Sequence, residues 1–196
     1  GSKIDMIVLH YTGMKSAAGA LARMCDPASE VSAHYMIDEE GGVFQLVVED
    51  MRAWHAGVSH WAGAVDINDR SIGIELVNPG HEFGCREFPA PQMAALEKLA
   101  ADIIARHGVP AHRVVGHSDI APTRKTDPGE LFDWRQLAER GIGVWSEAGP
   151  DQGSVDPTRA ARHLARYGYE VDEANPTPAI IAFQRHFRPS CFDGVM

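Results

Sequence analysis

The sequence predicts an α/β (α+β) fold, with helices around a central β-sheet and a small helical module at the C-terminus. Short apolar runs alternate with longer amphipathic segments through most of the chain, and helical patterns alone occupy its last part. A Gly- and Pro-rich stretch separates the two parts. At 196 residues, the chain is long enough to bury a core without disulfide bonds.

Four segments have the composition of strands. Met6 to Tyr11 is a β-branched and apolar run that ends beside a Thr-Gly break. Residues 34–37 and 43–48 flank a Gly-Gly turn, which predicts a hairpin. Residues 71–77 alternate isoleucine or leucine with small or polar residues, which places Glu75 on the face opposite to its apolar neighbours.

The clearest helix pattern covers residues 91–107, whose apolar positions recur with amphipathic spacing. Residues 17–24 are helix-prone, and residues 133–140 predict a short closing helix. Between them, the buried pair Val114-Val115 leads into a loop at residues 116–129 that is rich in Pro, Asp and Thr. Such a loop on rigid elements is a common place for functional residues.

We place the domain boundary where the composition changes. Residues 1–148 form the predicted first domain, residues 149–156 a linker, and residues 157–196 a small module with helical patterns at 157–167 and 178–187. Gly1 and Ser2 are typical of a cloning remnant, so we expect any signal peptide or anchor to have preceded them in the natural chain.

Composition excludes several classes of protein. The net charge is -9 and no run of Lys or Arg interrupts the acidic background, so we expect no nucleic-acid partner. No apolar run reaches the roughly 18 residues of a membrane span. We also expect the protein to be a monomer. Cys25, Cys85 and Cys191 lack CxxC spacing and are expected to be free thiols, although pairing of Cys25 with Cys85 stays open.

Three residues have the identities and placement of a catalytic zinc site. His10 ends the first strand, His117 follows the Val114-Val115 strand, and Asp127 lies ten residues further on. Two imidazoles and one carboxylate suit zinc and leave a fourth position open for water. Each residue alone is more often structural than a ligand, so the surrounding sequence has to decide.

Four ordered strings provide that decision: residues 7–12 (IVLHYT), 71–78 (SIGIELVN), 116–122 (GHSDIAP) and 124–129 (RKTDPG). Together they closely resemble the type-2 N-acetylmuramoyl-L-alanine amidase family, and the resemblance covers about residues 4–145. It implies a mixed sheet covered by helices, and hydrolysis of the amide bond between N-acetylmuramic acid and L-alanine of peptidoglycan or muropeptides.

The resemblance also implies the roles of five side chains. It implies that His10, His117 and Asp127 bind Zn²⁺ and that Glu75 and Lys125 are catalytic. A carboxylate such as Glu75 can take the proton of the attacking water and pass it to the leaving nitrogen. A cation such as Lys125 can stabilise the oxyanion of the tetrahedral intermediate.

Substrate contacts are predicted at four further residues. The string at residues 54–57 (WHAG) resembles a motif at the family's substrate groove, where Trp54 would pack on a sugar and His55 would donate a hydrogen bond. A structural turn is the alternative. Asn78 and Arg124 lie beside motif residues and are expected to contact peptide or muramyl groups.

The C-terminal segment resembles a small helical peptidoglycan-binding domain in its strings at residues 182–184 (AFQ) and 192–194 (FDG). The resemblance implies a third helix after the Asp-Gly turn, which a chain ending at Met196 does not include. A helical extension packed on the catalytic domain is the alternative. A wall-binding module favours the periplasm or the cell envelope as the location of the protein.

Two other functions compete with the amidase. A non-catalytic peptidoglycan receptor would keep the groove but lose a ligand, and all three predicted ligands are present. A glycosidase would need paired carboxylates, and Asp69 lies near Glu75 in the sequence, but outside any matching motif. The two hydrolases differ in product, since a glycosidase releases reducing sugars and an amidase releases the amino group of L-alanine.

Overall fold

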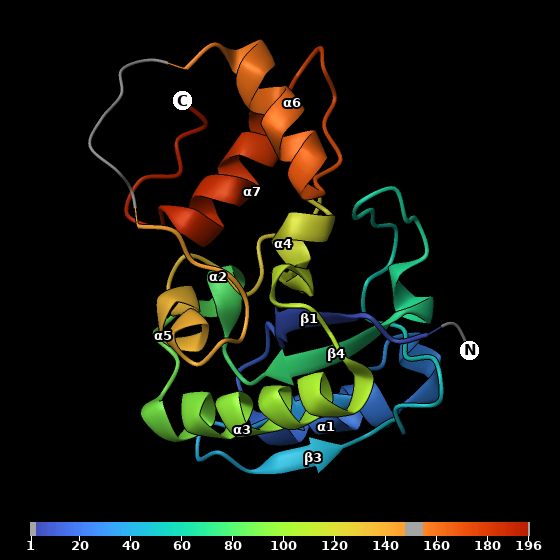
Figure 1. Ribbon diagram of the computed structural model, residues 1–196. Coiled ribbons are helices and arrows are strands. Elements are labelled where there is room, and N and C mark those ends of the chain that lie inside the picture. The colour runs from blue at the N-terminus through green and yellow to red at the C-terminus, as the bar shows by residue number, and fades with distance from the viewer. Residues whose placement is uncertain (1–2, 148–154, 196) are drawn as a thin grey trace.

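The computed structural model describes residues 3–147 and 155–195 (Figure 1). Within these ranges the strands form one five-stranded mixed sheet in the order β3-β2-β4-β1-β5. The pairs β2·β4, β4·β1 and β1·β5 are parallel, and β3 is antiparallel to β2 at the edge. The strands are β1 (Met6–Tyr11), β2 (Tyr35–Ile37), β3 (Val43–Gln45), β4 (Ser71–Leu76) and β5 (Val114–Gly116). The predicted fold class is confirmed.

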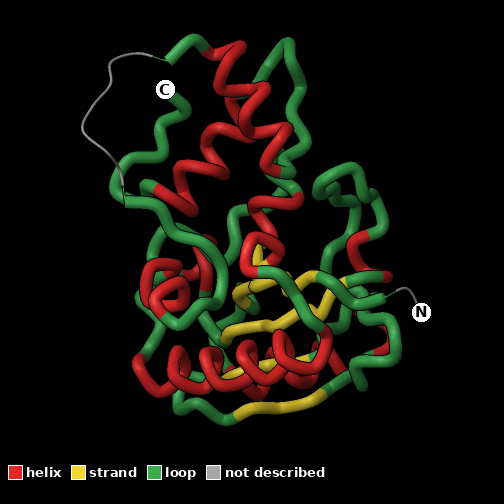
Figure 2. The backbone as a smooth tube through the Cα atoms, viewed as in Figure 1, coloured by secondary structure: helices red, strands yellow, loops and turns green. Residues whose placement is uncertain are grey.

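The helices are α1 (Ala17–Cys25), α2 (Gly80–Phe83), α3 (Ala90–His107), α4 (His117–Ile120), α5 (Trp134–Glu139), α6 (Pro157–Tyr167) and α7 (Thr177–Phe187), with 3₁₀ turns at Pro27–Ser29, Ile67–Asp69 and Ala111–Arg113 (Figure 2). Ser16 caps α1 by accepting a hydrogen bond from the Gly19 amide, and Gly108 ends α3 at φ 69°. The helix α4 differs from the predicted loop, because the Asp119 carboxylate accepts a hydrogen bond from the Gly116 amide and closes a helical turn there.

One face of the sheet packs against α3 through a mainly apolar layer. Ile72, Ile74 and Leu76 of β4 are fully buried in this layer, beside Ile7 and Leu9 of β1. The helix α3 contributes Met93, Leu96, Ala100 and Ile103 to the same cluster. These positions follow the alternation of the strand and the period of the helix, as the sequence pattern predicts.

The alternate residues of the same strands point to the opposite face. There Met6 and Val8 of β1 pack with Ile120 of α4 and Ile180 of α7. The parallel register places His10 directly beside Glu75 at the carboxyl ends of the two central strands. This face therefore ends in the imidazole of His10 and the carboxyl group of Glu75.

The C-terminal helices share this second core. Leu164 of α6 and Tyr169 pack in one cluster with Met6, Val8 and Trp61. The helix α7 lies beside α4, which follows β5 of the sheet (Figure 1). The predicted linker, 149–156, lies almost wholly outside the described residues. The division into domains at 1–148 and 157–196 stays a prediction.

Two smaller expectations can be compared with the structure. Cys25, Cys85 and Cys191 are all free thiols. In the described part of the chain, no helix has the length and apolar character needed to cross a membrane.

Candidate metal centre and active site

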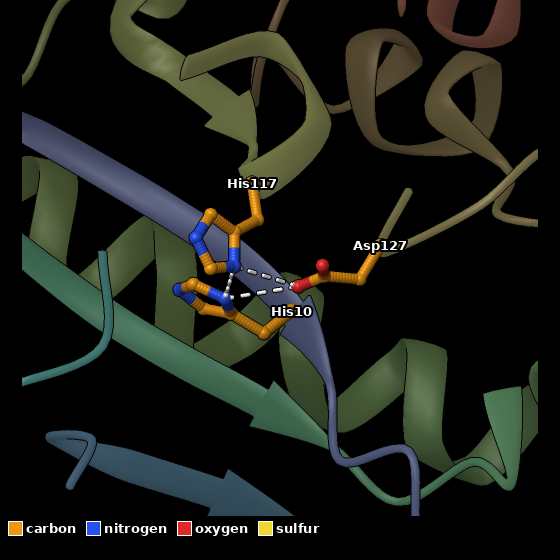
Figure 3. A group of neighbouring side chains, drawn as sticks. All are labelled: His10, His117 and Asp127. Carbon is orange, nitrogen blue, oxygen red and sulfur yellow. Dashed lines mark hydrogen bonds and ion pairs between the residues drawn. The ribbon is translucent and has the colours of Figure 1, made fainter. Parts of the chain in front are cut away.

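Three predicted ligands converge at the carboxyl end of β1 (Figure 3). The Nδ1 atoms of His10 and His117 lie 2.9 Å apart, and each lies 3.1 Å from Oδ2 of Asp127. All three side chains are buried. The sequence places these residues 107 and 10 positions apart, and the fold brings them within hydrogen-bond distance.

Local structure explains how one loop delivers two of these side chains. His117 is the first residue of α4, directly after β5, and the amide of Ser118 donates a hydrogen bond of 2.8 Å to the carbonyl of Asp127. Gly116 is required by close approach, because a Cβ there would lie 2.7 Å from Cδ of Pro128. The loop is therefore closed by main-chain contacts around the two ligands.

The hydrogen bonds of His117 fix its tautomer. Its Nε2 lies 3.0 Å from the carbonyl oxygen of Ala56, which can only accept, so Nε2 carries the proton. The lone pair of His117 Nδ1 then points toward His10 and Asp127.

A chain of hydrogen bonds fixes the tautomer of His10 in the same way. The Ser71 hydroxyl donates to the carbonyl of Ile67 at 2.7 Å, so it accepts from Nε2 of His55 at 3.3 Å. Nδ1 of His55 therefore accepts from Nε2 of His10 at 3.0 Å. The lone pair of His10 Nδ1 is left facing the other two ligand atoms, as expected for a metal ligand oriented by its second nitrogen.

Electrostatics favour a neutral His10 and an ionised Asp127. Burial, followed by the nearby His117, lowers the pKa of His10 to about 4, so His10 is neutral at pH 7. Burial raises the pKa of Asp127, but its contacts with His117 and His10 outweigh burial and hold that pKa below its usual range. Two imidazole lone pairs and one carboxylate thus face each other, and this donor set fits a divalent metal ion.

Both predicted catalytic residues, Glu75 and Lys125, line the same cavity as the three ligands, a cavity of about 400 Å³. Oε2 of Glu75 is buried and has no hydrogen-bond partner among the described residues. Burial, then the charge of Asp127, raises the pKa of Glu75 well above its usual value, and Lys125 opposes this shift. Glu75 is thus an unsatisfied carboxyl group aimed into the site.

The predicted substrate residues have different positions. Trp54 lines the cavity and is 56% exposed. The guanidinium group of Arg52 lies 4.4 Å from the centre of the Trp54 ring. Arg124 also lines the cavity and donates to the carbonyls of Ala56 and Val58. Both side chains therefore line the cavity that contains the three predicted ligands.

His55 and Asn78 make contacts within the protein instead. Both ring nitrogens of His55 are engaged, by His10 and Ser71, although the residue lines the cavity. Asn78 is fully buried, donates to the carbonyl of Arg86, accepts from the amide of Gly80 and is not among the residues that line the cavity. The structure thus brings His55, but not Asn78, to the metal centre.

Sequence reasoning missed two supporting residues. Ser71 orients His55, and Oδ1 of Asn68 accepts from the amides of His55 and Ala56. Ser71 had a signal, because it alternates with Gly73 and Glu75 on one face of β4. Gly73 belongs to the same arrangement, since a Cβ there would lie 2.4 Å from Cγ of His55.

A family model for N-acetylmuramoyl-L-alanine amidases matches residues 1–130. The chain belongs to this family. The amidase is 41% identical to the N-acetylmuramoyl-L-alanine amidase AmiD of Escherichia coli (strain K12), over 98% of this chain and 78% of that protein. It is 44% identical to the 1,6-anhydro-N-acetylmuramyl-L-alanine amidase AmpD of Enterobacter cloacae, over 55% of each.

Solved structures give the same result. The E. coli AmiD, in complex with anhydro-N-acetylmuramic acid-L-Ala-D-gamma-Glu-L-Lys, matches with a TM-score of 0.90 and 40% identity over 99% of this chain and 84% of that one. AmpDh3 of Pseudomonas aeruginosa, in complex with anhydromuramic pentapeptide, matches with a TM-score of 0.86 and 34% identity over 100% and 88%. The predictions of family and enzyme class are confirmed, and the roles of individual residues stay predictions.

Proposed function

We propose that the amidase uses Zn²⁺ to hydrolyse the bond between N-acetylmuramic acid and L-alanine in muropeptides or peptidoglycan. The observation that carries this proposal is the set of three unprotonated ligand atoms, His10 Nδ1, His117 Nδ1 and Asp127 Oδ2, at one cavity with the unpaired Glu75 carboxyl. Zinc supplies two kinds of chemistry when it is bound, a lowered pKa for water and polarisation of a carbonyl.

The side chains of the cavity supply the remaining chemistry. Glu75 accepts a proton from the attacking water at its unpaired Oε2 and returns it to the nitrogen of the leaving L-alanine. Burial, then the charge of Asp127, raises the pKa of Glu75, and a higher pKa makes its carboxylate a stronger base. Lys125 provides positive charge for the oxyanion from the same cavity wall.

The substrate class is proposed from the relatives. The AmiD and AmpDh3 complexes hold anhydromuramyl peptides, and we propose the same class for this chain. Trp54, half-exposed at the cavity, provides an aromatic face for the sugar, and Arg124 lines the same cavity with its guanidinium on the carbonyls of Ala56 and Val58.

Mass spectrometry of a soluble anhydromuramyl tripeptide before and after incubation tests the function. We expect free anhydro-N-acetylmuramic acid and a tripeptide with a new L-alanine amino terminus, with loss of turnover in a chelator and recovery when Zn²⁺ is added. Release of reducing sugars from polymeric peptidoglycan, with the amide intact, would indicate a glycosidase. Tight binding with no product would indicate a receptor.

Location, oligomeric state and wall binding belong to the same proposal. We propose a monomer of the periplasm or cell envelope whose residues 157–196 also contact peptidoglycan. The two strings that support wall binding, residues 182–184 and 192–194, are joined by a hydrogen bond in which the Gln184 side chain accepts from the amide of Gly194. Sedimentation velocity, cell fractionation and co-pelleting with sacculi test the three parts separately.

A further inference from the structure

A buried carboxylate beside the metal centre is held by the C-terminal segment. Asp119 is 1% exposed and lies two residues after the ligand His117. Its Oδ2 accepts from the amide of Gly116 at 2.7 Å and from Nδ1 of His186 at 2.8 Å. Its Oδ1 accepts from the Tyr169 hydroxyl at 2.6 Å. Two of its three donors therefore come from residues far along the chain.

Both of these donors are fixed by packing. The ring of His186 stacks between Trp134, at 3.8 Å between centroids, and Phe187, at 4.1 Å. Tyr169 is 2% exposed and packs edge-on against Trp61 at 5.1 Å. Since neither ring is free to rotate away, Asp119 is held in a single orientation, and so is the main chain on both sides of His117.

One ring nitrogen of His186 is in an unfavourable environment for the stability of the fold. Its Nε2 is buried and has no hydrogen-bond partner in the described part of the chain. A buried unpaired nitrogen destabilises the folded state, and an apolar ring at this position would avoid that cost. What the imidazole adds is its hydrogen bond to Asp119.

The same helix reaches the other end of the ligand loop. Arg185 lies 3.8 Å from Glu130, and Glu130 contacts Nε2 of His81 at 3.0 Å. Nδ1 of His81 lies 2.9 Å from the Tyr11 hydroxyl, which contacts the Thr126 hydroxyl between Lys125 and Asp127. Consecutive residues of α7 therefore contact both ends of the loop that carries His117, Lys125 and Asp127.

We infer that Asp119, held by Tyr169 and His186, positions the ligand His117, so that the C-terminal helices complete the metal centre. This inference rests on the proposed function, because it assigns a role at the same centre. Asp119 acts through the main-chain amide of Gly116, directly before the predicted ligand His117, rather than through the ligand atoms themselves. It is therefore a positioning residue.

Single-atom and rescue variants of the full chain test the inference. Tyr169→Phe removes one hydroxyl, and His186→Leu removes the second donor. His186→Asn restores an amide N–H near the position of Nδ1. Tyr167→Phe is the matched control, because its ring packs on Trp61 in the same cluster and its hydroxyl does not donate to Asp119. The measurements are the Kd for Zn²⁺ by chelator competition, kcat and KM on a soluble anhydromuramyl tripeptide, hydrogen exchange at residues 116–119, and Tm.

We expect Tyr169→Phe and His186→Leu to raise the Kd for Zn²⁺ about tenfold, to lower kcat with KM within about twofold, and to speed exchange at residues 116–119. His186→Asn should recover most of the loss, and Tyr167→Phe should match the wild type. If both donor variants keep the Zn²⁺ Kd and kcat within about twofold while Tm falls, the contacts are only structural and the inference is wrong. If His186→Leu does not fold, Tyr169→Phe decides by the same criteria.

The two proposals fail in different ways. A wild-type protein that neither binds Zn²⁺ nor cleaves the tripeptide overturns the proposed function. A wild-type protein that does both, with donor variants that do both equally well, overturns only the positioning role.

Discussion

The two faces of the central sheet are built from alternate residues of the same strands, but the two faces have different roles. In β4, Ile72 and Ile74 pack toward α3 and are fully buried, whereas on the opposite face Ser71 contacts His55 and Glu75 lines the cavity with the three predicted ligands. Burying an isoleucine side chain stabilises the folded state by about 1.5–3 kcal/mol. Leaving a buried carboxyl oxygen unpaired, as at Glu75, costs stability. In this six-residue strand, the residues that stabilise the core and the residues of the predicted active site therefore occupy alternate positions.

The largest expected effect is the loss of a ligand from the polar face. His117→Ala should abolish metal binding and turnover together, because two remaining donors do not hold zinc in a three-ligand site. Elemental analysis after dialysis and an activity assay measure both. The exposed His112, five residues earlier, is the control, and His112→Ala should retain stoichiometric zinc. Full zinc content in His117→Ala would remove His117 from the centre.

A smaller effect is expected at Glu75. Glu75→Gln keeps the shape of the side chain but removes the base, so kcat should fall by at least about 10² while zinc content and Tm stay near those of the wild type. Steady-state kinetics beside elemental analysis separate the two properties. Near-normal turnover would show that another group moves the proton.

A still smaller effect is expected from one added methyl group at Gly73. In Gly73→Ala, the Cβ would lie 2.4 Å from Cγ of His55 and would displace the imidazole that orients His10. Loss of such a supporting contact typically lowers metal affinity or activity by about 10-fold or more. Zinc titration against a chelator measures the affinity. Wild-type affinity would mean that His10 holds its orientation without His55.

The smallest effect should come from the apolar face, one residue away. Ile74→Val removes one methylene group from the core beneath α3, which typically costs about 0.5–1.5 kcal/mol of stability. We expect kcat and zinc affinity to be unchanged, because Ile74 points away from the cavity. Urea unfolding followed by kinetics on the same sample measures both. A clear fall in kcat would break the division between the two faces.

The periodic parts of the fold could be predicted from sequence, and its side-chain partners could not. The runs at β1, β4 and α3 indicate their own structure, because burial imposes periods of two and 3.6 on them. The ordered motifs also predicted the three residues that converge in the structure. The partners of His55, which are His10 and Ser71, depend on side-chain packing between separate segments, and such packing leaves no periodic trace.

The C-terminal contacts are the strongest case of this limit. Asp119 lies inside a predicted motif, but its donors Tyr169 and His186 are 50 and 67 residues away. The helical patterns that carry these donors are visible in the sequence. The sequence pattern does not predict which residues of these helices pack against α4, because that depends on the folded arrangement of distant segments.

The main-chain hydrogen bond from Ser118 to Asp127 has a consequence for how the centre can change. This hydrogen bond uses backbone atoms, so it does not involve the side chain at position 127. A substitution there would change the group that faces His10 and His117 and would leave this main-chain closure of the loop in place.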